Sequence, residues 1–305
     1  MTENTVQSDT YAGLSSESFF PGYESFKIKT KSGITINGVR GGSGPPLLLL
    51  HGAPVNLASW RKVAPLLQNN YTIIATDLRG YGDSDIPDAG TNHENYAFRL
   101  MAQDQVEVMN ELGYRDFQLV AHDRGARVAR RLTLDHPAAV KTLTVLDILP
   151  GLYFYDNISK SFAEAYWFWL MFTAPAPVPE NWINCDPVGF MTTSFFGRRD
   201  VVEQTAFDNF VRTMVRDGAA HAAMEDYRAG ATIDLEHDRA DFATKIECPV
   251  LILWGESNPL YSELDVLEVW RERATDLRGH GVDSNHWLPE IVPEEVAQEV
   301  MAFAT

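Results

Sequence analysis

The sequence predicts an α/β fold, with a mostly parallel central sheet flanked by helices. Short apolar runs bounded by turn residues recur along the 305 residues, as is typical of strands buried on both faces of a parallel sheet. Helical patterns lie between several of these runs. A long aromatic and helical stretch follows the sixth predicted strand, so the sequence also predicts a helical lid inserted there.

The N-terminal part of the chain predicts a polar arm followed by a β-hairpin. Residues 1–18 are polar and acidic, and we expect them to form the arm. Apolar and polar residues then alternate over 26–28 and 34–36, the pattern of a half-buried strand. Lys31-Ser32-Gly33 between them indicates the hairpin turn.

The buried strands of the predicted sheet are the apolar runs that follow this hairpin. They are Leu47–Leu50, Tyr71–Thr76, Phe117–Ala121, Leu143–Leu146 and Val250–Trp254. The clearest helix is predicted over Phe98–Leu112, where apolar residues recur near helical spacing and Gly113 is suited to end the helix.

The predicted domain organisation follows from the interruption of this alternation. Residues 148–242 contain no buried-strand run and are rich in aromatics and prolines, so we expect them to form the helical lid. Residues 19–147 and 243–305 then form the α/β core, because the strand pattern resumes at Pro249.

The charge and cysteine content exclude several classes of protein. With 25 basic and 42 acidic residues the net charge is −17, which disfavours nucleic acid and anionic membranes as partners. Cys185 and Cys248 are too few for a disulfide framework and lack metal-ligand spacing. No signal peptide or apolar run long enough to span a membrane is evident, so we expect a cytoplasmic protein. No phosphate-binding loop or metal-ligand cluster is present, so no cofactor is expected.

The segment Phe117–Arg130 carries the strongest chemical signal. A buried strand ends at Ala121, His122-Asp123-Arg124-Gly125 follows, and a helix then begins. This is the sharp strand–turn–helix that presents a nucleophile between small residues, with Asp123 at the nucleophile position. In the alternative interpretation, Asp123 only caps the following helix.

Three further loops fit a nucleophile at Asp123. His51-Gly52-Ala53-Pro54 follows one buried strand and Asp77–Ser84 follows the next. Near the C-terminus Asp283–Glu290 contains His286, which is suited to act as a base. His280, six residues earlier, is the competing histidine, but it falls within the predicted last strand.

These motifs together resemble the fluoroacetate (haloacetate) dehalogenases of the α/β-hydrolase superfamily. The resemblance runs from about Phe19 to the C-terminus and is closest in HDRGARVARRLTLDHP, VLDILP, APAPVPE and EDYRAG. It implies an α/β-hydrolase fold, a homodimer and a small anionic organohalide substrate. By resemblance, Asp123 is the nucleophile, His286 the base and Asp147 the acid that orients it. Glu256, after the later strand, is the rival for the role of the acid.

The resemblance also assigns the groups that surround the substrate. Arg124 and Arg127 resemble the pair that binds the substrate carboxylate, and their i, i+3 spacing lets both face one pocket. Trp169 and Tyr227 resemble residues around the leaving halide. An alkyl ester at Asp123 must be hydrolysed through an oxyanion, for which the backbone N–H groups of Ala53 and Arg124 are the expected donors.

One residue departs from the family pattern in the halide pocket. The dehalogenases carry a His-Trp pair there, whereas this chain has Phe168 before Trp169, and Phe168 cannot donate a hydrogen bond. Because fluoride gains most from such donors, we expect chloroacetate and bromoacetate to react better than fluoroacetate. Ala53 replaces a bulkier aromatic residue of the family, which predicts a wider pocket.

Other functions stay open at this point. An epoxide hydrolase uses the same nucleophile and base, with lid tyrosines that polarise the epoxide. Candidates for such tyrosines are Tyr153, Tyr155, Tyr166 and Tyr227. A neutral epoxide has no need of two arginines beside Asp123. A serine esterase is disfavoured because no serine stands in the turn, and a binding module without turnover is disfavoured by the intact Asp123, Asp147 and His286 set.

Overall fold

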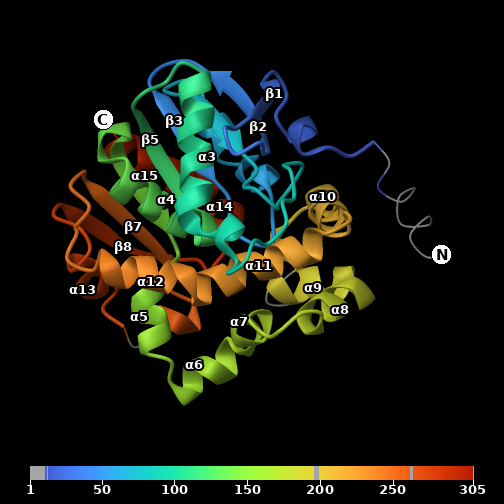
Figure 1. Ribbon diagram of the computed structural model, residues 1–305. Helices are drawn as coiled ribbons and strands as arrows, with labels where there is room; N and C mark the ends of the chain where they lie inside the picture. The colour runs from blue at the N-terminus through green and yellow to red at the C-terminus, as the bar shows by residue number, and fades with distance from the viewer. Residues whose placement is uncertain (1–10, 12, 196–198, 262–263, 305) are drawn as a thin grey trace.

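The computed structural model describes residues 11, 13–195, 199–261 and 264–304 (Figure 1). Most of the arm predicted for residues 1–18 therefore lies outside the described residues. Its described end differs from a free arm, because Ser16 begins the short 3-10 helix η1 (Ser16–Phe19) and is fully buried.

The described residues form one sheet of eight strands in the order β1-β2-β4-β3-β5-β6-β7-β8. The strands are β1 Glu24–Lys29, β2 Thr35–Gly42, β3 Pro46–Leu50, β4 Thr72–Thr76, β5 Phe117–His122, β6 Val140–Leu146, β7 Val250–Gly255 and β8 Leu277–Val282. β2 pairs antiparallel with β1 and β4, and the remaining pairs are parallel. This confirms the predicted hairpin and the mostly parallel sheet.

The continuous apolar runs are explained by burial on both faces of the sheet. In β3, Leu48 and Leu50 contribute to one hydrophobic cluster, and Leu47 and Leu49 contribute to the other. All four side chains are fully buried. Successive side chains of a strand point to opposite faces, so a strand covered on both sides must be apolar at every position.

Helices cover both faces (Figure 1). Buried residues of α3 (Phe98–Glu111) and α4 (Asp123–Asp135) join the cluster of Leu48, and those of α2 (Ala64–Leu67) and α15 (Pro293–Phe303) join that of Leu47. The predicted helix over 98–112 is thus confirmed, and Gly113 follows it with φ of +90°. The remaining core helices are α13 Val266–Arg271 and α14 Leu288–Ile291, with 3-10 turns η2 Leu57–Trp60, η3 Glu94–Tyr96, η4 Pro137–Ala139 and η6 Pro259–Tyr261.

Between β6 and β7 the described chain is helical. The helices are α5 Gly151–Asp156, α6 Lys160–Ala165, α7 Trp167–Phe172, α8 Val178–Cys185, α9 Pro187–Ser194, α10 Gln204–Met214, α11 Ala219–Ala231 and α12 Ile233–Ala240, with the 3-10 turn η5 Arg199–Val201. They gather along one end of the sheet (Figure 1). We refer to residues 148–242 as the insert.

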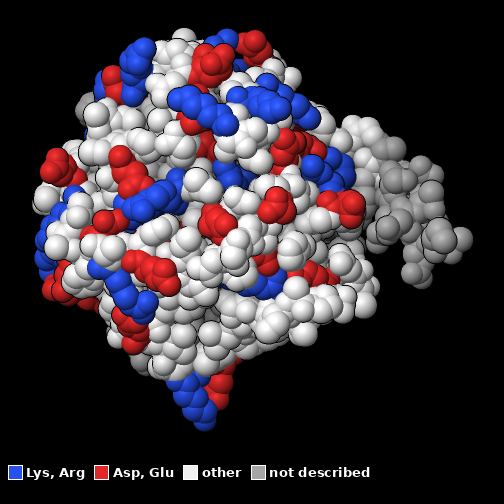
Figure 2. All heavy atoms as spheres, in the orientation of Figure 1, with Lys and Arg blue, Asp and Glu red and all other residues white. Residues whose placement is uncertain are grey.

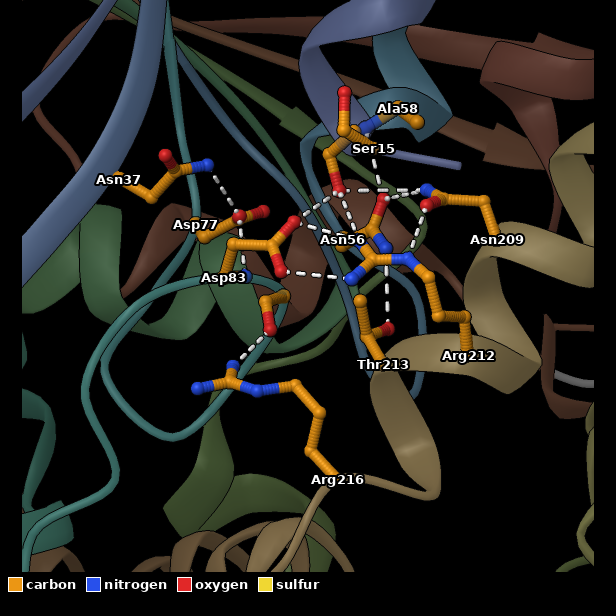
Figure 3. A network of polar contacts seen from close by, with 12 residues as sticks. Ser15, Asn37, Asn56, Ala58, Asp77, Asp83, Asn209, Arg212, Thr213 and Arg216 are labelled. Atoms are coloured by element: carbon orange, nitrogen blue, oxygen red, sulfur yellow. Dashed lines mark hydrogen bonds and ion pairs between the residues drawn. The ribbon is translucent and has the colours of Figure 1, made fainter. Parts of the chain in front are cut away.

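A polar junction ties the insert to the core (Figure 3). Arg212 of α10 forms an ion pair of 2.6 Å with Asp83, which lies in the loop after β4. Ser16 donates to the same carboxylate at 3.2 Å, and Arg216 donates to the carbonyl oxygens of Gly82 and Ser84. The N-terminal 3-10 helix, the core loop and the insert are therefore joined at one place.

The surface carries both signs of charge. On the face shown in Figure 2, acidic and basic side chains are interspersed, so the net charge of −17 is not gathered there in one acidic patch. Among the helices of the described residues, none is long and apolar enough to cross a bilayer.

Candidate active site

Asp123 stands at the sharp turn between β5 and α4. Its backbone has φ of +48°, a conformation that costs energy for a residue other than glycine and is common at functional sites. A side chain at Gly125 would meet the His51 carbonyl oxygen at 2.3 Å, so glycine is required there. Asp123 does not cap α4, because the capping position is His122. The structure therefore excludes the capping alternative and places Asp123 in the sharp turn that the sequence predicted.

The Asp123 carboxylate is buried and held by backbone donors. The Ala53 N–H donates to Oδ1 at 2.9 Å. Burial alone would raise the pKa of Asp123, but electrostatic interactions with His286 and His122 and backbone hydrogen bonds from Ala53 and Arg124 outweigh it and lower the pKa. Asp123 is thus ionised near neutral pH, and both predicted oxyanion donors already form hydrogen bonds to its carboxylate.

His286 lies between the two buried carboxylates. Its Nδ1 is 2.7 Å from Oδ2 of Asp147, and its Nε2 is 3.7 Å from Oδ2 of Asp123. Burial would lower the pKa of His286, but the hydrogen bond to Asp147 and the charges of Asp147 and Asp123 raise it overall. The bond to Asp147 directs Nε2 toward Asp123, which is the arrangement of a nucleophile, base and orienting acid.

The geometry distinguishes the rival residues of the sequence analysis. Asp147 follows β6, has φ of +53° and is nearly fully buried. Glu256 is exposed, and its side chain lies near Gly281 of β8. His280 is about half exposed and lies 3.6 Å from Glu299. Of each rival pair, His286 is therefore the histidine that lies beside Asp123, and Asp147 is the acid that bonds to His286.

The two arginines of α4 differ in what they contact. Arg127 lines the pocket beside Asp123, with its guanidinium 5.1 Å from the ring centre of Trp169. Its Nε and Nη2 are buried and have no hydrogen-bond partner within the described part of the chain. Burial and the nearby charge of Arg124 lower the pKa of Arg127. An anion in the pocket would satisfy these donors.

Arg124 departs from the prediction that both guanidinium groups face the pocket. It forms a buried ion pair with Asp226 of α11 and stacks between the rings of Phe98 and Tyr227, at 4.7 and 4.5 Å. A buried guanidinium needs a carboxylate, and Asp226 supplies it from the insert. The side chain of Arg124 is absent from the pocket lining, while its backbone N–H remains at Asp123.

The pocket at Asp123 is narrow and mostly apolar. The space open to the centres of water-sized molecules is about 40 Å³, which suits a ligand of few atoms. The predicted halide residues Phe168, Trp169 and Tyr227 all line it. Other lining residues include Ala53, Pro54, Leu149, Phe154, Tyr166, Phe172, Asn258 and Trp287. The described residues contain no cluster of His, Cys, Asp and Glu suited to hold a metal ion.

Comparison with known proteins assigns the family. The family model for the alpha/beta hydrolase fold matches residues 45–291. This chain belongs to the α/β-hydrolase family. Within it, the hydrolase falls in the haloacetate dehalogenase-like group, because a fluoroacetate dehalogenase of Burkholderia sp. is 41% identical over 93% of this chain and 94% of that protein.

Two further proteins are similar to this hydrolase over most of its length. A soluble epoxide hydrolase of Corynebacterium sp. (strain C12) is 31% identical over 89% of this chain and 94% of that protein. The crystal structure of an α/β-hydrolase-fold protein from Nostoc sp. PCC 7120 is 46% identical, with a TM-score of 0.92 over 94% of this chain and 99% of that one.

Two buried polar residues of the hydrolase were not expected from its sequence. Asn258 donates to Asp147 Oδ2 at 2.7 Å and lines the pocket. Asp226 accepts from Arg124 and, at 2.6 Å, from the hydroxyl of Tyr81. Asp226 lies within the EDYRAG motif, but the motif does not indicate that Asp226 pairs with Arg124. For Asn258 the only local signal is a polar residue just after a buried strand.

Proposed function

We propose that this hydrolase removes halide from short 2-halocarboxylic acids, converting haloacetate and water to glycolate and halide. The observation that carries the proposal is the buried, unpaired guanidinium edge of Arg127 in the wall of the pocket that holds Asp123. A charged donor fork of this kind matches a carboxylate. It would bind the acid group of the substrate while the adjacent carbon faces Asp123.

The first step is displacement at that carbon. Asp123 Oδ2 attacks the halogen-bearing carbon, the carbon–halogen bond breaks, and the halide leaves with the bonding electron pair. An ester then joins the Asp123 carboxyl to the carbon that carried the halogen. Because Ala53 N–H holds Oδ1, Oδ2 is the oxygen free to attack.

The second step is hydrolysis of the ester. His286 takes a proton from water, and the hydroxide attacks the Asp123 carbonyl carbon. The negative charge that develops on Oδ1 is stabilised by the backbone N–H groups of Ala53 and Arg124. The ester bond breaks, His286 returns the proton to the leaving alkoxide, and glycolate forms. The water oxygen stays in the Asp123 carboxylate, which later loses the added proton.

We propose that chloride and bromide are released faster than fluoride. Trp169 and Tyr227 line the pocket and carry N–H and O–H donors, whereas the ring of Phe168 offers none. Phe168→His should raise kcat/KM for fluoroacetate relative to chloroacetate by roughly 10- to 150-fold, since a hydrogen bond to a charged group has that effect on a rate. Phe168→Leu is the control without a donor, and a wild type that favours fluoroacetate would contradict the proposal.

An epoxide hydrolase is the second candidate, because it would use Asp123 and His286 as the same nucleophile and base. Of the tyrosines considered for that role, Tyr166 and Tyr227 line the pocket. The hydroxyl of Tyr166 donates to Asn258, and a neutral epoxide would leave Arg127 unpaired. Halide release from chloroacetate compared with diol formation from styrene oxide separates the two functions. We expect the first and not the second.

A further inference from the structure

The Asp147 carboxylate is fixed by donors on both oxygens. Oδ1 accepts from the Gly255 N–H at 2.7 Å. Oδ2 accepts from Nδ1 of His286 and from Nδ2 of Asn258, each at 2.7 Å. With three donors the carboxylate cannot rotate without losing a hydrogen bond, so the direction of its bond to His286 is set in part by Asn258.

The Asn258 amide is in turn held in one orientation. Its Oδ1 accepts from the hydroxyl of Tyr166 and from the Leu260 N–H at 3.0 Å. Because both groups donate, the atom that they contact must be the amide oxygen. The amide nitrogen Nδ2 therefore faces Asp147, and the flipped orientation of the amide is excluded. Asn258 is 2% exposed and Tyr166 6% exposed, so water cannot easily replace either contact.

Tyr166 connects this contact to the wall of the pocket. It lies in the insert, between α6 and α7, whereas Asn258 and Asp147 follow core strands. Its ring packs against Phe168 and Trp169, with ring centres 5.7 and 6.2 Å apart. Both neighbours line the pocket. The position of the insert against the substrate is therefore linked to the acid that orients His286.

We propose that Tyr166 and Asn258 are positioning residues that act through Asp147 on ester hydrolysis. The proposal rests on the proposed function, because it assumes an ester at Asp123. Tyr166 polarises the Asn258 amide, Asn258 holds Oδ2 of Asp147, and Asp147 aims His286 at the water that attacks the ester. The Tyr166–Asn258 relay thereby links the insert to the second chemical step.

The relay should leave the first step unaffected. Displacement of halide uses Asp123, whose orientation depends on Ala53 and Arg124 and not on Asp147. Hydrolysis requires the base, and the base requires Asp147. Loss of the relay should therefore slow hydrolysis and leave the ester to accumulate.

The experiment compares Tyr166→Phe and Asn258→Ala with the wild type on chloroacetate, using rapid quench for halide and intact mass for the ester. We expect the first-turnover halide burst to keep its rate within about twofold. Ester hydrolysis should slow about 2- to 10-fold in Tyr166→Phe, which loses a neutral hydrogen bond, and roughly 10- to 150-fold in Asn258→Ala, which loses one to a carboxylate. Accordingly kcat should fall. The value of kcat/KM should not change, because it reports only the steps up to and including halide release.

Tyr153→Phe is the matched control, because it removes a hydroxyl from the insert outside the pocket lining. It should leave both steps unchanged. If Tyr166→Phe, folded as judged by thermal unfolding, slows both steps equally or neither, the relay is contradicted. A wild type that releases no halide from chloroacetate instead contradicts the proposed function, so the two failures are distinguishable.

Discussion

Nε2 of His286 lies 3.7 Å from Oδ2 of Asp123, beyond the range of a hydrogen bond. In the proposed mechanism the imidazole therefore leaves that oxygen free to attack the substrate, and it lies beside the carboxyl group that water attacks in the second step. A carboxylate oxygen that accepted a hydrogen bond from His286 would be a weaker nucleophile. Under the proposed mechanism, this spacing lets Asp123 and His286 act in separate, successive steps.

Replacing the base should stop the reaction after its first step. In His286→Gln we expect one equivalent of halide per active site and an enzyme that gains the mass of one carboxymethyl group. Asp123 keeps its backbone donors in this variant, so displacement can proceed without the imidazole. Intact mass spectrometry after chloroacetate treatment measures the adduct. Sustained turnover, or no halide at all, would be inconsistent with His286 as the base of the second step.

The rate of ester hydrolysis should decrease as the pH is lowered and His286 becomes protonated. Its pKa in the free enzyme is raised above 6.5, because Asp147 and Asp123 together outweigh the effect of burial. Esterification removes the Asp123 charge, so the pKa of His286 should be lower in the ester. His51 and His122 have a pKa lowered to about 4 by burial and stay neutral in this range.

Single-turnover hydrolysis measured against pH tests this assignment. We expect a single protonation to reduce the hydrolysis rate at low pH. The apparent pKa of this rate should lie below the pKa of His286 measured in the free enzyme by nuclear magnetic resonance. A hydrolysis rate that does not vary between about pH 5 and 8 would argue against a histidine base.

Arg127 should contribute to the binding of halocarboxylic acids and not to the binding of the corresponding amides. Arg127→Met is expected to raise KM for chloroacetate roughly 10- to 150-fold, because a charge-assisted hydrogen bond is lost. With chloroacetamide, which carries no charge, the same variant should be within about threefold of the wild type. Steady-state kinetics with both substrates measures the contrast. Equal losses on both would mean that Arg127 supports the pocket without binding a carboxylate.

Asp226 should matter for stability, since it pairs with a fully buried arginine. The side chains of Arg124 and Asp226 are 1% and 0% exposed. Asp226→Asn leaves the guanidinium uncompensated and should lower the free energy of unfolding by about 3–5 kcal/mol. Glu24→Gln breaks the exposed pair with Arg40 and should cost under about 1 kcal/mol. Denaturant unfolding of both variants tests the difference, and comparable losses would contradict it.

The strands and the sharp turn at Asp123 were predictable because local patterns encode them, and the same patterns indicated the candidate set of Asp123, Asp147 and His286. Apolar runs mark strands buried on both faces, and the small residues around Asp123 mark the turn. The choice of Asp147 over Glu256 rested on resemblance, and the structure supplies its physical reason, since Asp147 lies within hydrogen-bond distance of His286.

What the sequence left undetermined depends on the insert. The i, i+3 spacing places Arg124 and Arg127 on neighbouring sides of α4. The residue that pairs with Arg124, however, is Asp226, which lies 102 residues away in the sequence. Likewise, Asn258 meets Tyr166 across 92 residues. No periodicity encodes such contacts. The homodimer and the cytoplasmic location stay predictions.

The central claim is that Asp123 forms an ester with the substrate, and the fate of the water oxygen tests it most directly. A single turnover is run with enzyme in excess over chloroacetate, in water enriched in the heavy oxygen isotope. The mechanism predicts label in the peptide that contains Asp123 and none in the first glycolate formed. Label in that glycolate, with an unlabelled Asp123, would mean that water attacks the substrate directly.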